Sequence, residues 1–411
     1  MKSGFAPLIC AAVLALAWPT AAPAQRTISL GGSAPDVPIP LDGGGPKVPA
    51  IDPATLQGLP SAHDYRPPQG ITFSAADFIS ENVHLTAQWF WAADSDGKTL
   101  PTVIMAPGWG ATAATLREGA IDLARAGYLV MLFDYRGWGD SDGRVMLAGA
   151  RSVAGGAVAA GPVTGGAFSA EVRELRGYVD PSEQAQDWLN AVSYAVTMPT
   201  VDADRIGVLG SDLAGGHVIY AAAFEPRIKA LVSQVSRMDT RPSKPYQPDP
   251  AKVVAEADAA ASRLATGQAQ YPADPARAVG NKVVRWTPID QAEDVITPAL
   301  FVLAQNEELF SNTHNGQLAC EEVKGPRKMV MLPKATHYDI YGGDRARAIN
   351  AAIDWFDRYL KPPGAPTRVP LNPKEPARGD CNPPPPPPSG DSDKNGSGEG
   401  HKASPTSGRF N

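Results

Sequence analysis

The sequence of 411 residues has little of several features that define particular protein classes. Its three cysteines are too few for a disulfide-rich scaffold, and no Cys/His cluster has the spacing of a metal site. Beyond the first residues, no uncharged apolar stretch reaches the roughly 18 residues of a transmembrane helix. Lys and Arg number 37 against 43 Asp and Glu, a net charge of −6, so a basic excess for nucleic acid is lacking. What is present is a mildly acidic chain, 43% hydrophobic, with enough apolar residues for a core.

Glycine and proline are in surplus, at 40 and 41 residues, and they gather in particular places. Residues 25–70 are rich in both and show no periodicity, which predicts an extended N-terminal arm. The same composition returns in residues 361–411, where six consecutive prolines predict a polyproline stub in a disordered tail. Residues 148–167 are nearly all Gly, Ala, Val and Ser, which predicts a long loop inside the body.

The first residues have the pattern of a secretory signal, residues 1–24. Lys2 precedes an apolar run at 7–18, and small residues lead to a cleavage site after Ala24. We therefore expect a periplasmic or secreted protein with no integral membrane segment after signal removal. In an oxidising compartment Cys320 and Cys381 could form a disulfide between the tail and the body, but the sequence does not show whether they meet.

Between residues 71 and 360 short apolar runs alternate with helical patterns. Strands are expected at 83–91, 102–106, 128–133, 205–209, 230–234, 299–304 and 328–332, and helices at 111–126, 181–198, 213–224 and 344–359. Most of the strand candidates are continuous apolar runs, which is typical of strands buried on both faces. The alternation predicts an α/β fold in which helices cover both faces of a mostly parallel sheet.

The most informative segment is 205–217, RIGVLGSDLAGGH, which combines a strand, a tight turn and a helix. It resembles the nucleophile elbow of the α/β hydrolases. In that turn the central residue has strained dihedral angles, and the residues two before and two after it must be small. With Asp212 at the centre these neighbours are Gly and Ala, whereas with Ser211 they would be two leucines that clash. Sterics therefore favour Asp212; the plain alternative is a turn in which this aspartate caps the helix.

The family's order along the chain is nucleophile, acid and histidine, the last two after later strands. Here the strand at 299–304 is followed by Glu307 and Glu308, and the next strand by His337. These strand ends lie at the carboxyl edge of the sheet, where open α/β folds place their sites. The resemblance thus implies a catalytic triad of Asp212, His337 and Glu307, with Glu308 as the alternative acid.

The likeness covers most of residues 71–360. Residues 105–110, MAPGWG, resemble the family's oxyanion loop. Residues 133–143, FDYRGWGDSDG, resemble a loop of the dienelactone-hydrolase-like and X-Pro-dipeptidyl-peptidase-like branch. The resemblance implies the α/β-hydrolase fold, with an eight-stranded mostly parallel sheet, helices on both faces and a cap inserted after the sixth strand, here about 236–295.

An aspartate at the elbow departs from that branch and is typical of epoxide hydrolases and haloalkane dehalogenases. A carboxylate that attacks a saturated carbon forms an ordinary ester, whereas attack on a carbonyl gives a mixed anhydride. The resemblance therefore implies hydrolysis of an epoxide- or alkyl-halide-like small molecule through an ester on Asp212. The backbone N–H groups of Trp109 and Leu213 would bind the oxyanion. Tyr246 and Tyr271 in the cap either donate to an opening epoxide oxygen or serve as packing.

Two other functions stay open at this point. The chain could be an ester or peptide-bond hydrolase in which Asp212 activates water or Ser211 is the nucleophile. It could also be a catalytically silent binding protein, because a fold does not by itself imply activity. We expect neither metal nor organic cofactor and no nucleic acid, but a small-molecule substrate; the oligomeric state is open.

Overall fold

The computed structural model describes residues 59–147, 171–242, 249–265, 277–278, 280–362 and 381. By its contacts the chain separates into two units, Met1–Pro38 and Ile39–Asn411, and every described residue belongs to the second. The predicted signal segment 1–24 and the predicted loop 148–167 lie outside the described residues, as do most of the arm and most of the tail.

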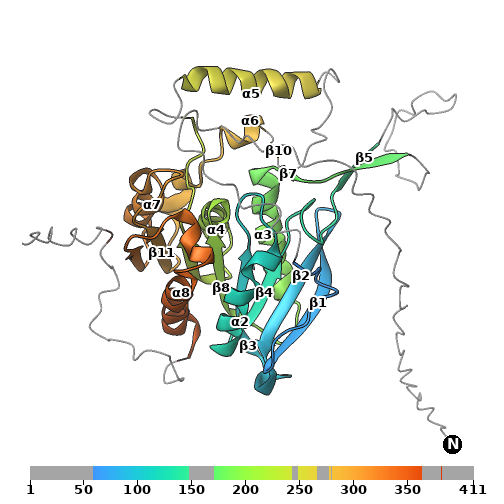
Figure 1. Ribbon diagram of the computed structural model, residues 1–411, viewed down its shortest axis with the longest axis vertical. Coiled ribbons are helices and arrows are strands. Elements are labelled where there is room, and N and C mark those ends of the chain that lie inside the picture. Colours follow the sequence, from blue (N-terminus) through green and yellow to red (C-terminus); the bar gives the residue numbers. More distant parts are fainter. Residues whose placement is uncertain are drawn as a thin grey trace, which may run out of the picture. The chain divides into compact units, whose positions relative to one another are not determined.

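An eight-stranded sheet forms the centre of the described chain (Figure 1). Its strands lie side by side in the order β1 (Ile71–Ser80), β2 (Val83–Ala92), β4 (Leu129–Phe133), β3 (Leu100–Ala106), β8 (Val201–Ser211), β9 (Ile228–Gln234), β11 (Ala299–Ala304) and β12 (Arg327–Leu332). The β1–β2 and β2–β4 pairs are antiparallel, and the other neighbours are parallel. The predicted eight-stranded, mostly parallel sheet is confirmed.

Helices cover both faces of this sheet through two hydrophobic clusters. One face is covered by α2 (Arg117–Arg125) and α8 (Arg345–Leu360), the other by α3 (Pro181–Ala195), α4 (Leu213–Phe224) and α7 (Gly316–Glu322). The helix predicted at 111–126 begins as a short 3₁₀ turn, η2 (Ala113–Leu116), before it continues as α2. The two-sided covering follows from the apolar faces of the helices.

Strand β4 shows why the central strands are apolar at every position. Leu129, Met131 and Phe133 belong to the cluster under α3 and α4, whereas Val130 and Leu132 belong to the cluster under α2 and α8. Successive side chains of a strand point to opposite faces, so a strand covered on both sides must be apolar throughout.

The chain leaves the sheet in two insertions. Between β4 and α3 it forms the hairpin of β5 (Arg144–Leu147) and β6 (Val172–Leu175) and the short β7 (Tyr178–Val179). Between β9 and β11, in the segment predicted as a cap, it forms α5 (Pro250–Ala265), β10 (Arg277–Ala278), α6 (Gly280–Val283) and η3 (Pro288–Asp294). β10 pairs in parallel with β7, and Lys282 forms an ion pair with the buried Asp180. The two insertions are therefore in contact.

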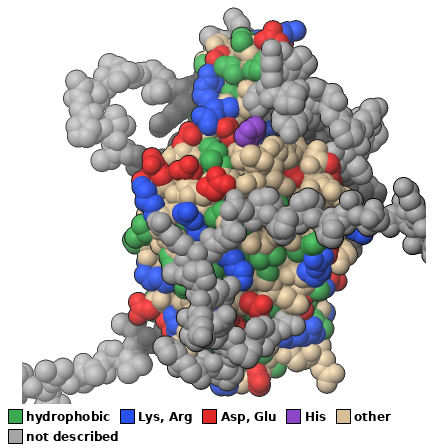
Figure 2. All heavy atoms as spheres, turned by 90° about the vertical axis from the view of Figure 1, so that its left-hand side faces the viewer, with side chains coloured by type: hydrophobic (Ala, Val, Ile, Leu, Met, Phe, Trp, Pro, Cys, Tyr) green, Lys and Arg blue, Asp and Glu red, His purple; other side chains and the backbone are tan. Residues whose placement is uncertain are grey.

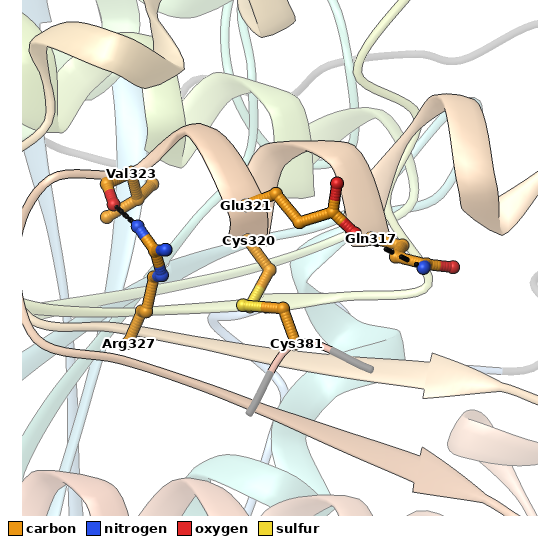
Figure 3. Close-up of a disulfide and its surroundings, with 6 residues drawn as sticks. All are labelled: Gln317, Cys320, Glu321, Val323, Arg327 and Cys381. Atoms are coloured by element: carbon orange, nitrogen blue, oxygen red, sulfur yellow. Dashed lines mark hydrogen bonds between the residues drawn. A yellow bond between two sulfur atoms is a disulfide. The ribbon is translucent and has the colours of Figure 1, made fainter. Parts of the chain in front are cut away.

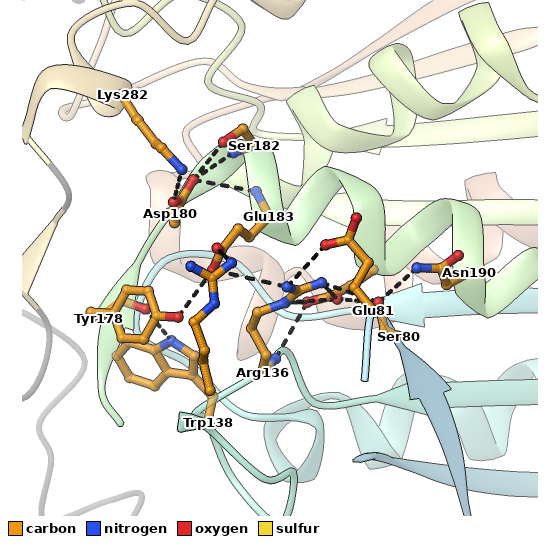
Figure 4. A network of polar contacts seen from close by, with 12 residues as sticks. Ser80, Glu81, Arg136, Trp138, Tyr178, Asp180, Ser182, Glu183, Asn190 and Lys282 are labelled. Atoms are coloured by element: carbon orange, nitrogen blue, oxygen red, sulfur yellow. Dashed lines mark hydrogen bonds and ion pairs between the residues drawn. The ribbon is translucent and has the colours of Figure 1, made fainter. Parts of the chain in front are cut away.

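A buried ionic network anchors the loop that follows β4 (Figure 4). Arg136 donates from Nη2 to Asp187 Oδ1 over 2.6 Å, and the two side chains are 2% and 0% exposed. The same guanidinium donates to Ser80 Oγ at 3.1 Å and contacts Glu81 at 3.2 Å. Removing one partner of such a buried pair costs about 3–5 kcal/mol. The network fixes this loop to α3 and to the β1–β2 turn.

A disulfide joins Cys320 of α7 to Cys381, with a Cα–Cα distance of 5.8 Å (Figure 3). This is the pair that the sequence left open. The bond ties Cys381 of the tail to the helix layer over β11 and β12.

Among the described residues, no helix has the length and apolar character needed to cross a membrane. Figure 2 shows Lys and Arg side chains interspersed with Asp and Glu on one face of the molecule. On that face the described side chains form no large basic surface.

Candidate active site

Asp212 lies at a strained turn between β8 and α4. Its backbone has φ 54° and ψ −124°, a conformation that a residue with a side chain rarely adopts. A Cβ on Gly210 would lie 2.1 Å from the carbonyl oxygen of Ala214, so the turn requires glycine there. The sequence favoured Asp212 because its neighbours two positions away are small, and in the folded turn these neighbours are in close contact.

One carboxylate oxygen of Asp212 is held by the loop that follows β3. The backbone N–H of Trp109 donates to Oδ2 over 2.8 Å. Gly108 allows this approach, because a Cβ at that position would lie 2.8 Å from Asp212 Cβ and Oδ2. The other oxygen, Oδ1, faces His337, and the Asp212 side chain is 15% exposed.

Ser211 has a different environment, although it is adjacent. It is the last residue of β8 and only 2% exposed, and its hydroxyl donates to Gln234 Oε1 on the neighbouring strand at 3.2 Å. Its hydroxyl is therefore engaged in the protein interior, whereas the Asp212 carboxylate lies between the Trp109 N–H and the His337 ring.

The loops after β11 and β12 bring an acid to a histidine. His337 Nδ1 lies 3.0 Å from both Oε1 and Oε2 of Glu307. His337 Nε2 lies 3.9 Å from Asp212 Oδ1, which is too long for a direct hydrogen bond. A carboxylate on Nδ1 favours the tautomer whose proton is on Nδ1, and this leaves Nε2 able to accept a proton. Glu308 binds the main chain of the same residue: its Oε2 accepts from the backbone N–H of His337 at 2.8 Å.

The electrostatics of this pair follow from burial and charge. Burial alone lowers the pKa of His337, but the hydrogen bond to Glu307 and the charges of Asp212, Glu307 and Glu308 outweigh it, so the pKa is raised. Burial also raises the pKa of Glu307, and the bond to His337 only partly offsets this. The imidazole is therefore a stronger base than a free one.

The other buried histidine close to the elbow, His217, is not placed as a base. It is 0% exposed in the middle of α4, and its Nδ1 lies 3.2 Å from the hydroxyl of Tyr135. Burial lowers the pKa of His217 to about 3, so it stays neutral. His217 is therefore a hydrogen-bonded core group and not a base.

Aromatic side chains surround the site, and two of them were not singled out from the sequence. Tyr338 packs edge-on against His337 with ring centroids 5.1 Å apart, and burial and the Asp212 charge raise its pKa to about 12. Phe310 packs edge-on against the same imidazole, with ring centroids 5.5 Å apart. The signal for both was their nearness in sequence to the acid and the histidine. The predicted cap tyrosines, Tyr246 and Tyr271, lie outside the described residues.

Leu213, the other predicted oxyanion donor, directly follows Asp212 as the first residue of α4. Its side chain is 1% exposed and belongs to a small apolar cluster that includes Trp286, with Trp109 and Trp138 packed against it. The wall beside the elbow is therefore apolar and aromatic. Within the described part of the chain, no group of three or more His, Cys, Asp or Glu side chains is arranged to hold a metal ion.

A family model for the α/β hydrolase fold matches residues 101–284. An uncharacterised 31.7 kDa protein of Escherichia coli is 23% identical over 268 residues, which is 57% of this chain and 82% of that protein. The thiohydrolase aneE of Aspergillus aculeatus is 23% identical over 199 residues, 48% of this chain and 52% of its own length.

Solved structures share the fold at low sequence identity. A hypothetical protein of Pseudomonas aeruginosa superposes with a TM-score of 0.57 at 16% identity, covering 74% of this chain and 98% of that one. Together with the family match, the sheet order and the elbow, this defines the class of fold: the chain has the α/β-hydrolase fold. The family match and the hydrolase name of the curated relative aneE support a hydrolase.

Proposed function

We propose that this hydrolase uses Asp212 as a nucleophile, His337 as the base and Glu307 as the acid that orients it. The substrate is a small molecule with a saturated carbon that bears a leaving group, as in an epoxide or an alkyl halide. The observation that carries the proposal is the placement of a carboxylate at the elbow, with one oxygen on a backbone N–H and the other facing the histidine.

In the first step Asp212 Oδ1 attacks the substrate carbon. A C–O bond forms, and the bond to the leaving group breaks with its electron pair. A halide leaves as the anion, whereas an epoxide oxygen becomes an alkoxide that must acquire a proton. The Tyr338 side chain lies close enough to Asp212 for the carboxylate charge to raise its pKa. Its hydroxyl is therefore a candidate donor of this proton, as are the predicted cap tyrosines. The product of this step is an ester on the enzyme.

In the second step water hydrolyses that ester. His337 Nε2 takes a proton from water while the hydroxide attacks the Asp212 carbonyl carbon, and the developing charge falls on the oxygen that the Trp109 N–H binds. Such a donor contributes about 3–4 kcal/mol to the transition state in comparable sites. The tetrahedral intermediate then releases the product alcohol, which takes the proton from His337. The raised pKa of His337 suits it to this transfer near neutral pH.

The two steps can be separated by His337→Gln. This variant should form the ester but hydrolyse it slowly, so intact-protein mass spectrometry should find the enzyme heavier by the alkyl group of a halide substrate or by the whole mass of an epoxide substrate. His314→Gln is the matched control, because His314 is an exposed histidine in a short 3₁₀ turn. An active wild type whose His337→Gln variant accumulates no adduct with any epoxide or haloalkane would contradict the proposal.

A second candidate is an ester or thioester hydrolase in which Asp212 acts on water instead of carbon. The observation in its favour is the thiohydrolase name of a curated relative. In this reaction no enzyme ester forms, so turnover of ester substrates without a mass adduct on His337→Gln would support it. Ser211 as the nucleophile is disfavoured by its burial and its bond to Gln234.

We also propose that the protein is exported. The signal pattern of residues 1–24 and the Cys320–Cys381 disulfide support this, because disulfides persist in oxidising compartments. Fractionation of cells that express the full chain should give a product shortened at Ala24 outside the cytoplasm. A full-length cytoplasmic product would contradict it.

A further inference from the structure

The loop after β11 and the loop after β12 are joined residue by residue. Gln305 Oε1 accepts from the backbone N–H of Lys334 at 2.8 Å. The backbone N–H of Asn306 donates to the carbonyl of Ala335 at 2.8 Å, and its side-chain amide donates to the carbonyl of Lys334 at 3.1 Å. Two glutamates continue this series, and both reach His337. The base is thus held by a clamp made of residues 305–308.

The two glutamates bind different parts of the same residue. Glu307 lies 3.0 Å from the ring nitrogen Nδ1, and Glu308 Oε2 accepts from the backbone N–H at 2.8 Å. This N–H belongs to the first residue of a 3₁₀ turn, η5 (His337–Tyr341), so the turn itself offers it no acceptor. The neighbouring Thr336 N–H is satisfied locally by Asp339 Oδ2 at 2.7 Å. For the His337 N–H, Glu308 supplies the acceptor.

We propose that Glu308 is a positioning residue for the base: it fixes the main chain of His337 while Glu307 fixes the ring. The inference rests on the proposed role of His337 in hydrolysis. Two separate anchors, one on the main chain and one on the ring, restrict both the place and the rotation of the imidazole. A base that must reach one water molecule next to Asp212 gains from both restrictions.

The carboxylate of Glu308 also adds negative charge beside the imidazole. The ionisable groups that face His337 are Asp212 from the elbow, Glu307 and Glu308 from the clamp, and Tyr338 from η5 itself. A cation lies nearby as well, because the guanidinium of Arg237 is 5.9 Å from the centre of the Phe310 ring, which packs on the imidazole. Three carboxylates against one nearby cation favour the protonated imidazole.

Two variants separate the anchoring from the charge. Glu308→Gln retains an oxygen that accepts from the backbone N–H but loses the charge, whereas Glu308→Ala loses both. Glu322→Gln is the control, because it removes the same charge from an exposed position on α7. In the full-length chain, imidazole titration by nitrogen NMR is measured together with kcat, and the His337→Gln spectrum identifies the resonance of His337.

We expect Glu308→Gln to keep kcat within about threefold at high pH, and to titrate His337 at a lower pH than wild type. Glu308→Ala should show the same change in titration but lose at least about tenfold in kcat, since the base is no longer held in place. Two results would overturn the inference: wild-type titration and kcat in both variants, or equal losses of kcat in the two. The NMR titration does not depend on which group attacks the substrate, so a failure of the proposed function would be recognised separately.

Discussion

Gly108→Ala should remove activity while it leaves the fold intact. A Cβ at this position would lie 2.8 Å from Asp212 Cβ and Oδ2, whereas ordinary contacts begin at 3.4 Å, so the groups must separate by about 0.6 Å. That shift lengthens the 2.8 Å bond from Trp109 N–H to Oδ2 beyond the range of a good hydrogen bond. Loss of one such donor costs roughly 10²–10³ in kcat. The added Cβ would meet the Asp212 side chain and, at 3.0 Å, the backbone carbonyl of Ser211, so the loss of stability should be about 1–3 kcal/mol.

The assay is kcat with the best substrate from a screen of esters, epoxides and haloalkanes, together with thermal unfolding. Gly342→Ala is the control, since no atom lies within 4 Å of a Cβ there. Gly210→Ala gives the opposite comparison, because its Cβ would lie 2.1 Å from a backbone oxygen and should destabilise the fold itself. The reasoning is refuted if Gly108→Ala retains more than half of the wild-type kcat, or if its unfolding resembles that of Gly210→Ala.

Three further predictions concern the disulfide, the adjacent serine and the pH dependence. Replacing Cys320 and Cys381 by serine should lower the free energy of unfolding by up to about 4 kcal/mol for a separation of 61 residues, and urea unfolding of reduced wild type should give a similar loss. Ser211→Ala should keep kcat within about twofold and lose about 1 kcal/mol of stability with its bond to Gln234; a fall in kcat of a hundredfold would show that the serine reacts. Because the Glu307 hydrogen bond and the carboxylate charges raise the pKa of His337 in the free enzyme, nitrogen NMR of the imidazole should show it titrating above 6.5, the value of an ordinary histidine. A midpoint below 6.5 would contradict the charge environment described for the imidazole.

The sheet could be predicted because its central strands carry apolar residues on both faces. Strand β11 was predicted with its bounds, 299–304, and β4 to within one residue. Strand β1 was not predicted as a strand. It lies at the edge of the sheet, and only Ile71, Phe78 and Ser80 of its ten residues are buried, so it has no continuous apolar run. The Arg136–Asp187 pair joins residues 51 positions apart and leaves no local signal.

The candidate site was predictable where a local steric rule applied. Asp212 followed from the small residues around it, which the turn needs in order to close. The choice between Glu307 and Glu308 could not be made with certainty from the sequence, because adjacent residues on a loop point in directions that only the folded loop determines. In the structure Glu307 binds the ring of His337, and Glu308 accepts from its backbone N–H. Sequence order had placed both acids at the correct strand end but could not distinguish their partners.

The most direct test of the central proposal is to follow the oxygen atoms of Asp212. Over many turnovers in heavy-oxygen water, each hydrolysis of the enzyme ester should insert one oxygen from water into this carboxylate. Mass spectrometry of the peptide that contains Asp212 should then show the label, and enzyme incubated without substrate should not. Full turnover with an unlabelled Asp212 peptide would contradict the account and favour attack by water directly on the substrate.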